Sequence, residues 1–341
     1  MKRITWILAL GAIAGVACGD DDGGGGVDSG GVDAADRDTG GGTDAGDEDS
    51  GTALQLPVVM IGDGPDPTDE TGIALDPASA APANLACFAM GMAPVGGDDV
   101  TFQLRIQEFR TDDTLEGLCV KFYDDNAPIP GDTCDPDSDL VTDSDGLVDV
   151  TGPSGGWYSY RVFPKDGPSP SLQIAGSVQI NEPAPSENRQ VEGNSVSQAT
   201  LDLIPTVLGF RQVPGTALVA GTAFDCDEEP LYGTIVRIFR EDGTEVSEGM
   251  ASQDPHYRYF DGDDFPKRDM PHTHADGIFT VANIPVAADG EFVFVEMWGI
   301  RTDGGELELL GCERLPLFAD TISIVNMAPI RADAPACPGA S

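Results

Sequence analysis

Residues 275–285 read Ala-Asp-Gly-Ile-Phe-Thr-Val-Ala-Asn-Ile-Pro, a turn followed by an alternating apolar run. Asp276 and Gly277 favour a tight turn, because glycine takes left-handed backbone angles without steric cost. After this turn Phe279 and Val281 share one face of an extended chain, since strand side chains alternate with a period of two. The stretch therefore predicts a strand that buries one face in the core of a sheet.

The same pattern recurs along most of the chain. Short β-rich runs alternate with Gly, Asp and Pro turns, and helical periodicity is nearly absent, as is typical of sandwiches and barrels. Residues 181–195, rich in Pro, Glu, Asn and Ser, predict a long loop or a link between domains. Strands are expected at residues 100–109, 118–123, 147–150, 157–163, 217–224, 234–240, 278–283, 291–298, 306–312 and 321–327.

Three further stretches of the second half join residues 275–285 in a recognisable order. Residues 221–225 read Gly-Thr-Ala-Phe-Asp, residues 229–238 read Glu-Pro-Leu-Tyr-Gly-Thr-Ile-Val-Arg-Ile, and residues 292–295 read Phe-Val-Phe-Val. This order resembles the carboxypeptidase regulatory-like domain, a transthyretin-like β-sandwich, over roughly residues 215–330. The resemblance implies a sandwich whose Pro-turn-Gly segment fixes a hairpin.

The first half echoes two of these landmarks, at residues 118–122 and 143–150, which predicts a divergent second copy. The expected fold is all-β, with two transthyretin-like or Ig-like Greek-key β-sandwich domains after a disordered acidic tether. The expected segments are a signal peptide (1–17), a lipidated cysteine and tether (18–52), a first sandwich (53–195) and a second sandwich (196–341) with an insertion at 247–274.

The N-terminus resembles an export and membrane-targeting signal. Lys2 and Arg3 precede an apolar run over residues 4–16, which is too short to span about 30 Å of hydrocarbon and therefore predicts a signal peptide. It ends in Gly-Val-Ala-Cys-Gly, which resembles the bacterial lipobox and implies that Cys18 is acylated and becomes the mature N-terminus. The alternative is an ordinary signal peptide with an incidental cysteine. Gly19 favours the outer membrane or cell surface over inner-membrane retention.

Residues 19–52 contain ten Asp, one Glu, one Arg and twelve Gly. Such a segment buries too little to offset its chain entropy, so it predicts a disordered spacer between the membrane and the folded part. The formal net charge of the whole chain is −41, which argues against a nucleic-acid partner.

Six cysteines follow Cys18, and an even number in an exported chain predicts disulfides. No Cys-x-x-Cys pair occurs, which argues against a zinc ribbon or a thioredoxin-like motif. All fifteen pairings stay open from sequence. The favoured set is Cys119 with Cys134, Cys226 with Cys312, and Cys87 with Cys337.

All three histidines, His256, His272 and His274, fall in the 247–274 insertion. If residues 271–276 are extended, His272 and His274 point to one face and can share a metal ion. The insertion therefore predicts either a transition-metal site or a solvated polar loop.

Tyr257 and Tyr259 invite a comparison with intradiol ring-cleavage dioxygenases, which carry a related sandwich and bind iron through two Tyr and a His-x-His pair. In that family the His-x-His follows the Asp-Gly strand, whereas here residues 272–274 precede Asp276. The iron ligands therefore do not transfer position by position.

A second candidate metal site is an acidic cluster whose oxygen density suits calcium. Its sixth and twelfth positions do not carry the Gly and Glu of an EF-hand, so a looser calcium site competes with a solvated, turn-rich cluster. The candidate ligands are Asp135, Asp137, Asp139, Asp143 and Asp145.

Two other motifs favour structural roles. Residues 152–156 match Gly-x-Ser-x-Gly, but strands flank the motif on both sides, which predicts a hairpin turn and no nucleophile elbow. Trp157, Tyr158 and Tyr160 predict half-buried sandwich core, and a sugar-stacking face is the alternative.

Together these features predict a membrane-anchored extracytoplasmic lipoprotein without catalytic activity. Its expected role is binding, adhesion or structure in the cell envelope, with the membrane, an envelope protein or a carbohydrate as partner and with no resident cofactor. The first alternative is a metalloprotein, such as a dioxygenase-like oxidative enzyme, that binds a transition metal through histidines of the 247–274 insertion. The second alternative is a structural module that calcium stiffens at the acidic cluster.

Overall fold

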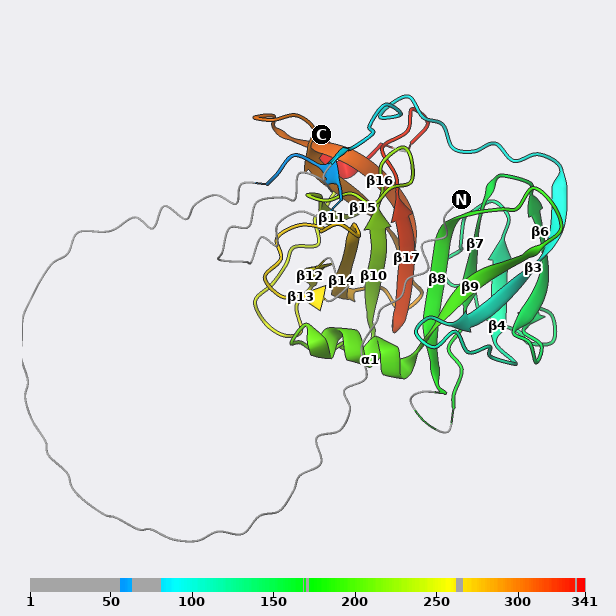
Figure 1. Ribbon diagram of the computed structural model, residues 1–341. Helices are drawn as coiled ribbons and strands as arrows, with labels where there is room; N and C mark the ends of the chain where they lie inside the picture. Colours follow the sequence, from blue (N-terminus) through cyan, green and yellow to red (C-terminus); the bar gives the residue numbers. More distant parts are fainter. Residues whose placement is uncertain are drawn as a thin grey trace, which may run out of the picture. The chain divides into compact units, whose positions relative to one another are not determined.

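The computed structural model describes residues 56–62, 81–167, 169, 172–261, 266–334 and 336–340. The expected signal peptide, Cys18 and the acidic tether lie outside these residues. Strands dominate the described part of the chain, and the all-β prediction is confirmed (Figure 1). No helix in this part is both long and apolar enough to cross a membrane.

The first half of the described chain contains only strands. In chain order they are β1 (Met60–Ile61), β2 (Ala81–Pro82), β3 (Asp99–Glu108), β4 (Cys119–Tyr123), β5 (Leu140–Val141), β6 (Leu147–Pro153), β7 (Trp157–Val162), β8 (Ile174–Pro183) and β9 (Gln190–Ser197).

The second half adds a short α-helix and a 3₁₀ turn. Its elements are α1 (Gln198–Val207), β10 (Thr216–Ala223), β11 (Ile235–Arg240), β12 (His256–Phe260), β13 (Pro266–Lys267), β14 (Ile278–Pro285), β15 (Glu291–Ile300), β16 (Leu307–Leu317), β17 (Thr321–Met327) and η1 (Pro338–Ala340).

Two sandwich cores form from alternating strand residues. In the first half β6, β3 and β9 face β5, β4, β7 and β8, and the core between them includes Phe102, Val120 and Tyr160. In the second half β12, β14, β10 and β17 face a three-stranded sheet of β11, β15 and β16. Phe279 of β14 is fully buried there, as the alternation after Gly277 predicts.

The two halves share one sheet, because β8 pairs in parallel with β17, which itself pairs in parallel with β10 (Figure 1). Val178 and Ile180 of β8 belong to the core of the second half. A Cβ atom on Gly176 would lie 2.3 Å from Oγ1 of Thr321, so this pairing requires glycine at position 176. The boundary expected between residues 195 and 196 stays a prediction.

The loop expected over residues 181–195 is wrong. β8 continues to Pro183 and β9 begins at Gln190, pairing in parallel with β3. The polar residues Gln190 and Glu192 lie on the exposed face of this strand, while Val191 is buried. The strand therefore resembles a loop in its composition.

Helix α1 was not expected from the sequence. Ser197 caps its N-terminus, where the hydroxyl accepts from the backbone N–H of Thr200. Leu201 and Leu208 are buried in a small core with Leu218 of β10, and Figure 1 shows α1 at one end of β8 and β10. Tertiary packing therefore stabilises the helix. Its sequence alone does not predict it, because it is only ten residues long and contains Pro205.

All six described cysteines form disulfides, as expected, but two of the three favoured pairs are wrong. Cys119 does bond Cys134, whereas Cys87 bonds Cys226 and Cys312 bonds Cys337.

The reason lies in the faces that the cysteines occupy. Cys312 packs with Phe239 and Phe294 in a cluster separate from the sandwich cores, where the C-terminal segment covers it. Cys226 follows β10, where the chain around Asn84 reaches it: the N–H of Cys226 donates to the carbonyl of Asn84 at 2.9 Å.

Candidate functional site

An open cleft of about 320 Å³ lies where strands of both halves meet the segment that follows Cys87. Ala93, Pro94 and Gly96 line one part of it, and Pro153 and Gly156, at the β6–β7 turn, line another. Its polar and aromatic lining consists of Asp124, Asp125, Asn126, Trp157, Asn181, Glu313 and Arg331.

Arg331 is the centre of the charged part of the cleft. Its Nη1 lies 2.9 Å from Oε1 of Glu313, and its Nε lies 3.2 Å from Oδ1 of Asp333. The guanidinium also lies over the ring of Trp157, 4.6 Å from the centroid, as in cation–π contacts. These contacts hold Arg331 and Trp157 in one fixed arrangement.

Glu313, on β16, is 7% exposed. Burial raises the pKa of its carboxyl above the usual range, and Arg331 and the Asn181 amide oppose this rise by stabilising the charged form. A buried carboxylate with a guanidinium partner is expensive to disturb, so this pair fixes the wall of the cleft.

Two asparagines form the neighbouring wall. Nδ2 of Asn126 donates to Oδ1 of Asn181 at 2.6 Å, and the backbone N–H of Asn181 donates to Oδ1 of Asn126 at 2.9 Å. Both residues have positive φ, 57° and 59°, a region that asparagine tolerates better than most residues. Nδ2 of Asn181 faces Glu313 but makes no well-formed hydrogen bond in the described part of the chain.

The segment after Cys87 is held rigidly beside the cleft. The N–H of Ala89 donates to the carbonyl of Ile330 at 2.8 Å, and the N–H of Ala93 donates to Oδ2 of Asp333 at 3.0 Å. With the Cys87–Cys226 disulfide, these bonds present Met90 and Met92 to solvent, 72% and 63% exposed.

The three histidines of the insertion lie in two places. The His256 ring, in β12, stacks on Phe210 with centroids 4.5 Å apart, and burial and the nearby Arg258 lower its pKa. His272 and His274 instead pack edge-on against Tyr232. Two groups of three ligating side chains within metal-binding spacing occur among the described residues, and neither includes a histidine.

The two tyrosines of the dioxygenase comparison have structural roles. The phenol oxygen of Tyr259 accepts from the N–H of Val236 at 3.0 Å, and that of Tyr257 accepts from the N–H of Ile238 at 3.3 Å. The two phenols thus cross from β12 to the edge strand β11 and satisfy its outward N–H groups. Burial raises the pKa of both phenols, which disfavours the phenolate that iron would bind.

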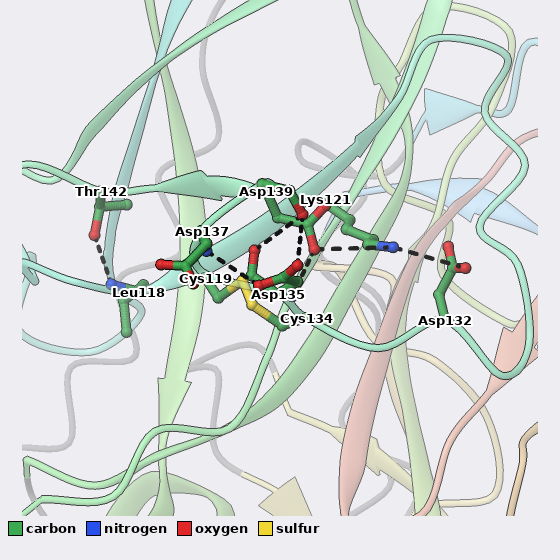
Figure 2. The surroundings of a disulfide bond; sticks show 10 residues. Leu118, Cys119, Lys121, Asp132, Cys134, Asp135, Asp137, Asp139 and Thr142 are labelled. Atoms are coloured by element: carbon green, nitrogen blue, oxygen red, sulfur yellow. Dashed lines mark hydrogen bonds and ion pairs between the residues drawn. A yellow bond between two sulfur atoms is a disulfide. The ribbon is translucent and has the colours of Figure 1, made fainter.

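The acidic cluster forms turns beside the Cys119–Cys134 disulfide (Figure 2). Oδ2 of Asp139 accepts from the N–H of Asp135 at 2.8 Å, and Oδ1 of Asp135 accepts from the N–H of Asp137 at 3.2 Å. Figure 2 also shows Lys121 between Asp139 and Asp132, at 4.0 and 3.7 Å.

Asp143 makes a separate turn, in which its Oδ1 accepts from the N–H groups of Asp145 and Leu147, both at 2.9 Å. No set of three carboxylates within the described ranges reaches metal-ligand spacing. The carboxylates therefore serve the backbone of their own turns, and calcium binding there stays a prediction.

The three aromatic residues of β7 divide between two environments. Tyr158 and Tyr160 are 2% and 1% exposed in the first core, as the core interpretation predicts, whereas Trp157 reaches the cleft. Residues 152–156 end β6 and turn toward β7, but the expected hairpin is wrong, because β6 pairs with β3 and β7 pairs with β4 and β8.

Sequence reasoning missed most of the cleft. It singled out Trp157 but not Asn181, Glu313 or Arg331, which stand in no local motif. Asn126 after two aspartates is a turn signal, and the other clue is a lone Arg, Arg331, in a C-terminal stretch with a single Asp.

Comparisons with known proteins are sparse. No protein-family model and no curated protein sequence matches the chain. The shaft pilin SpaA of Lactobacillus rhamnosus GG aligns with 69% of this chain and 98% of its own, at 14% identity and a TM-score of 0.20. GBS52, a minor pilin of Streptococcus agalactiae, aligns with 70% and 99%, at 8% identity and a TM-score of 0.19. A TM-score this low assigns neither a family nor a function.

Proposed function

We propose that this chain is a lipid-anchored, extracytoplasmic binding module that holds a carbohydrate in the cleft beside Trp157, without catalysing a reaction. The single observation that supports this most is the cleft itself. An aromatic ring and several planar polar side chains meet there, three of them on the strands β7, β8 and β16, and ion-pair and cation–π contacts hold Arg331 among them. Carbohydrate rings present C–H faces that pack on indole and hydroxyls that pair with carboxylates and amides.

The cysteines favour an extracytoplasmic location. The three disulfides of the structure suit an oxidising environment, and the lipobox-like sequence ending at Cys18 would place the protein outside the cytoplasm on an acylated cysteine. Two acyl chains would be needed for stable attachment. In this proposal the second half is a member of the carboxypeptidase regulatory-like domains, which would serve as a rigid scaffold here.

The anchoring half of the proposal is tested by fractionating cells that express the chain. The wild-type protein should remain with membranes and incorporate a labelled fatty acid, and Cys18→Ser should incorporate none. A wild-type chain that is soluble, or a serine variant that takes up as much label as the wild type, contradicts lipid anchoring.

The binding half is tested by titrating the full chain with a panel of neutral, amino and acidic oligosaccharides while following tryptophan fluorescence. Binding should be lost in Trp157→Ala and kept in Trp298→Phe, since Trp298 does not line the cleft. If no saccharide binds, or if Trp157→Ala binds as well as the wild type, the carbohydrate assignment is overturned.

A further inference from the structure

The charge of the cleft restricts which carbohydrate it can hold. Asp124 and Asp125 line its exposed side, Glu313 lines its buried side, and Arg331 is the one cation among the described lining residues. Three carboxylates and one guanidinium leave the lining acidic.

Arg331 is also already committed. It binds Glu313 and Asp333 at 2.9 and 3.2 Å and stacks on Trp157, so an anionic ligand would have to displace a carboxylate from it. Glu313 is buried, and removing its partner would leave an uncompensated charge. Uronic-acid and sulfated sugars are therefore disfavoured.

A second observation points to a ligand at this place. Asn181 is 6% exposed, and its Nδ2 lacks a well-formed hydrogen bond within the described chain. Nδ2 of Asn181 carries two hydrogens and faces one carboxylate, that of Glu313. A buried amide N–H₂ without a full set of partners is costly, and a ligand hydroxyl in the cleft would supply an acceptor for the second hydrogen.

The electrostatic field of the whole molecule also favours a cationic ligand. With 59 acidic and 18 basic residues, the chain attracts cations from solution and concentrates them at an acidic cleft.

We infer that the ligand of the cleft is a carbohydrate that carries a free, protonated amino group, such as a glucosamine oligomer. This inference rests on the proposed function and names its ligand class. The ammonium binds Asp124 and Asp125 on the exposed side of the cleft, the sugar ring lies against Trp157, and a hydroxyl accepts from Asn181.

The test compares three short oligomers by calorimetry on the full chain: glucosamine, N-acetylglucosamine and galacturonic acid. The glucosamine oligomer should bind about tenfold or more tightly than its N-acetylated counterpart, because acetylation removes a charge-assisted hydrogen bond. The galacturonic acid oligomer should bind most weakly. Asp124→Asn/Asp125→Asn should remove the preference for the free amine.

A chain of this charge also attracts cations without a site, so the design includes two controls. Trp157→Ala keeps every charge and should abolish binding. Asp289→Asn/Asp303→Asn removes the same charge from turns that do not line the cleft and should change nothing.

Equal binding of the free and acetylated oligomers would overturn this inference and leave the proposed function standing. Binding that the control pair weakens as much as the cleft pair, with Trp157→Ala unaffected, would show non-specific attraction and overturn the inference. Binding of none of the three oligomers, in a panel where other sugars also fail, would overturn the proposed function with it.

Discussion

The side chain of Glu108 links β3 to the turn that follows it and to the start of α1. This carboxylate ends β3, is 4% exposed, and accepts five hydrogen bonds from the start of α1 and from the turn after β3. Its donors are the N–H and hydroxyl of Ser197, the hydroxyl of Thr200, and the N–H groups of Arg110 and Thr111. Because five hydrogen bonds stabilise this buried carboxylate, its role is to hold β3 and α1 together.

Glu108→Gln should therefore destabilise the fold in a pH-dependent way. Burial raises the pKa of Glu108, but the hydrogen bonds from Ser197, Thr200 and the backbone outweigh burial, so the folded-state pKa lies below the usual value. Its stabilisation is present above the unfolded-state pKa, near 4.3, and is lost as the pH falls through the folded-state pKa.

Urea unfolding should show Glu108→Gln less stable by about 1–3 kcal/mol at pH 7, because hydrogen bonds to a charged acceptor are lost. The difference should shrink as the pH falls below about 4. Glu187→Gln, at an exposed position, should change neither value. A difference independent of pH would contradict the ionised state of Glu108.

Tyr259→Phe tests the phenol bridge between β12 and β11. Removing the hydroxyl leaves the N–H of Val236 without its acceptor, at a cost of about 1–3 kcal/mol of unfolding free energy. Amide hydrogen exchange at Val236 should accelerate more than exchange in the first sandwich, because the lost hydrogen bond also opens this edge locally. Unaltered protection at Val236 would show that the phenol does not hold this edge.

At the scale of elements, the disulfides should contribute according to the loops they close. Cys119 and Cys134 are 15 residues apart, and Cys87 and Cys226 are 139 apart. The chain-entropy relation gives about 3 kcal/mol for the shorter loop and about 5 kcal/mol for the longer one.

Paired alanine substitutions at each disulfide, followed by urea unfolding, measure these contributions. The Cys87→Ala/Cys226→Ala variant should lose more stability than Cys119→Ala/Cys134→Ala. The reverse order would mean that closing the longer loop does not restrain the unfolded chain as the chain-entropy relation expects. Non-reducing peptide mapping of the wild type checks the three pairings directly.

Strand prediction succeeded where alternation was local. The runs at residues 100–109 and 278–283 alternate buried and exposed residues or follow a clear turn, and both coincide with strands. β9 was not predicted because polar side chains occupy its exposed face. α1 was not predicted because its short apolar stripe is stabilised only by packing on β10 and β17.

The cleft was beyond sequence reasoning for a different reason. Asn126 and Asn181 are 55 residues apart and Glu313 lies far beyond both, in the other sheet of the second half, so only the packing of the two halves brings them together. The disulfide pairs failed likewise, because the face of β16 on which Cys312 lies depends on the C-terminal segment that covers it. Histidine spacing predicted a metal ion shared by His272 and His274. Both rings pack against Tyr232, while His256 stacks on Phe210, and a metal ion on this loop stays a prediction.

For the whole molecule, the sheet that runs through β8 and β17 predicts cooperative unfolding of both halves. Thermal unfolding of the full chain should give one transition by calorimetry and by circular dichroism. Gly176→Ala should lower the stability of both halves by about 1–3 kcal/mol, because its Cβ would collide with Thr321.

Gly97→Ala is the matched control, since its Cβ would meet its nearest neighbour at 3.6 Å, an ordinary contact. Two separate transitions, with Gly176→Ala affecting neither, would instead describe two independent domains.

The proposed function depends first on one chemical feature that stays a prediction, an acylated Cys18 on an oxidised extracytoplasmic chain. Intact-mass spectrometry of the protein extracted from membranes without reductant tests it most directly. The predicted species begins at Cys18, carries the mass of a diacyl or triacyl glyceryl group, and has no thiol that reacts with an alkylating reagent. A chain that retains residues 1–17, or that carries free thiols and no lipid, would contradict the account.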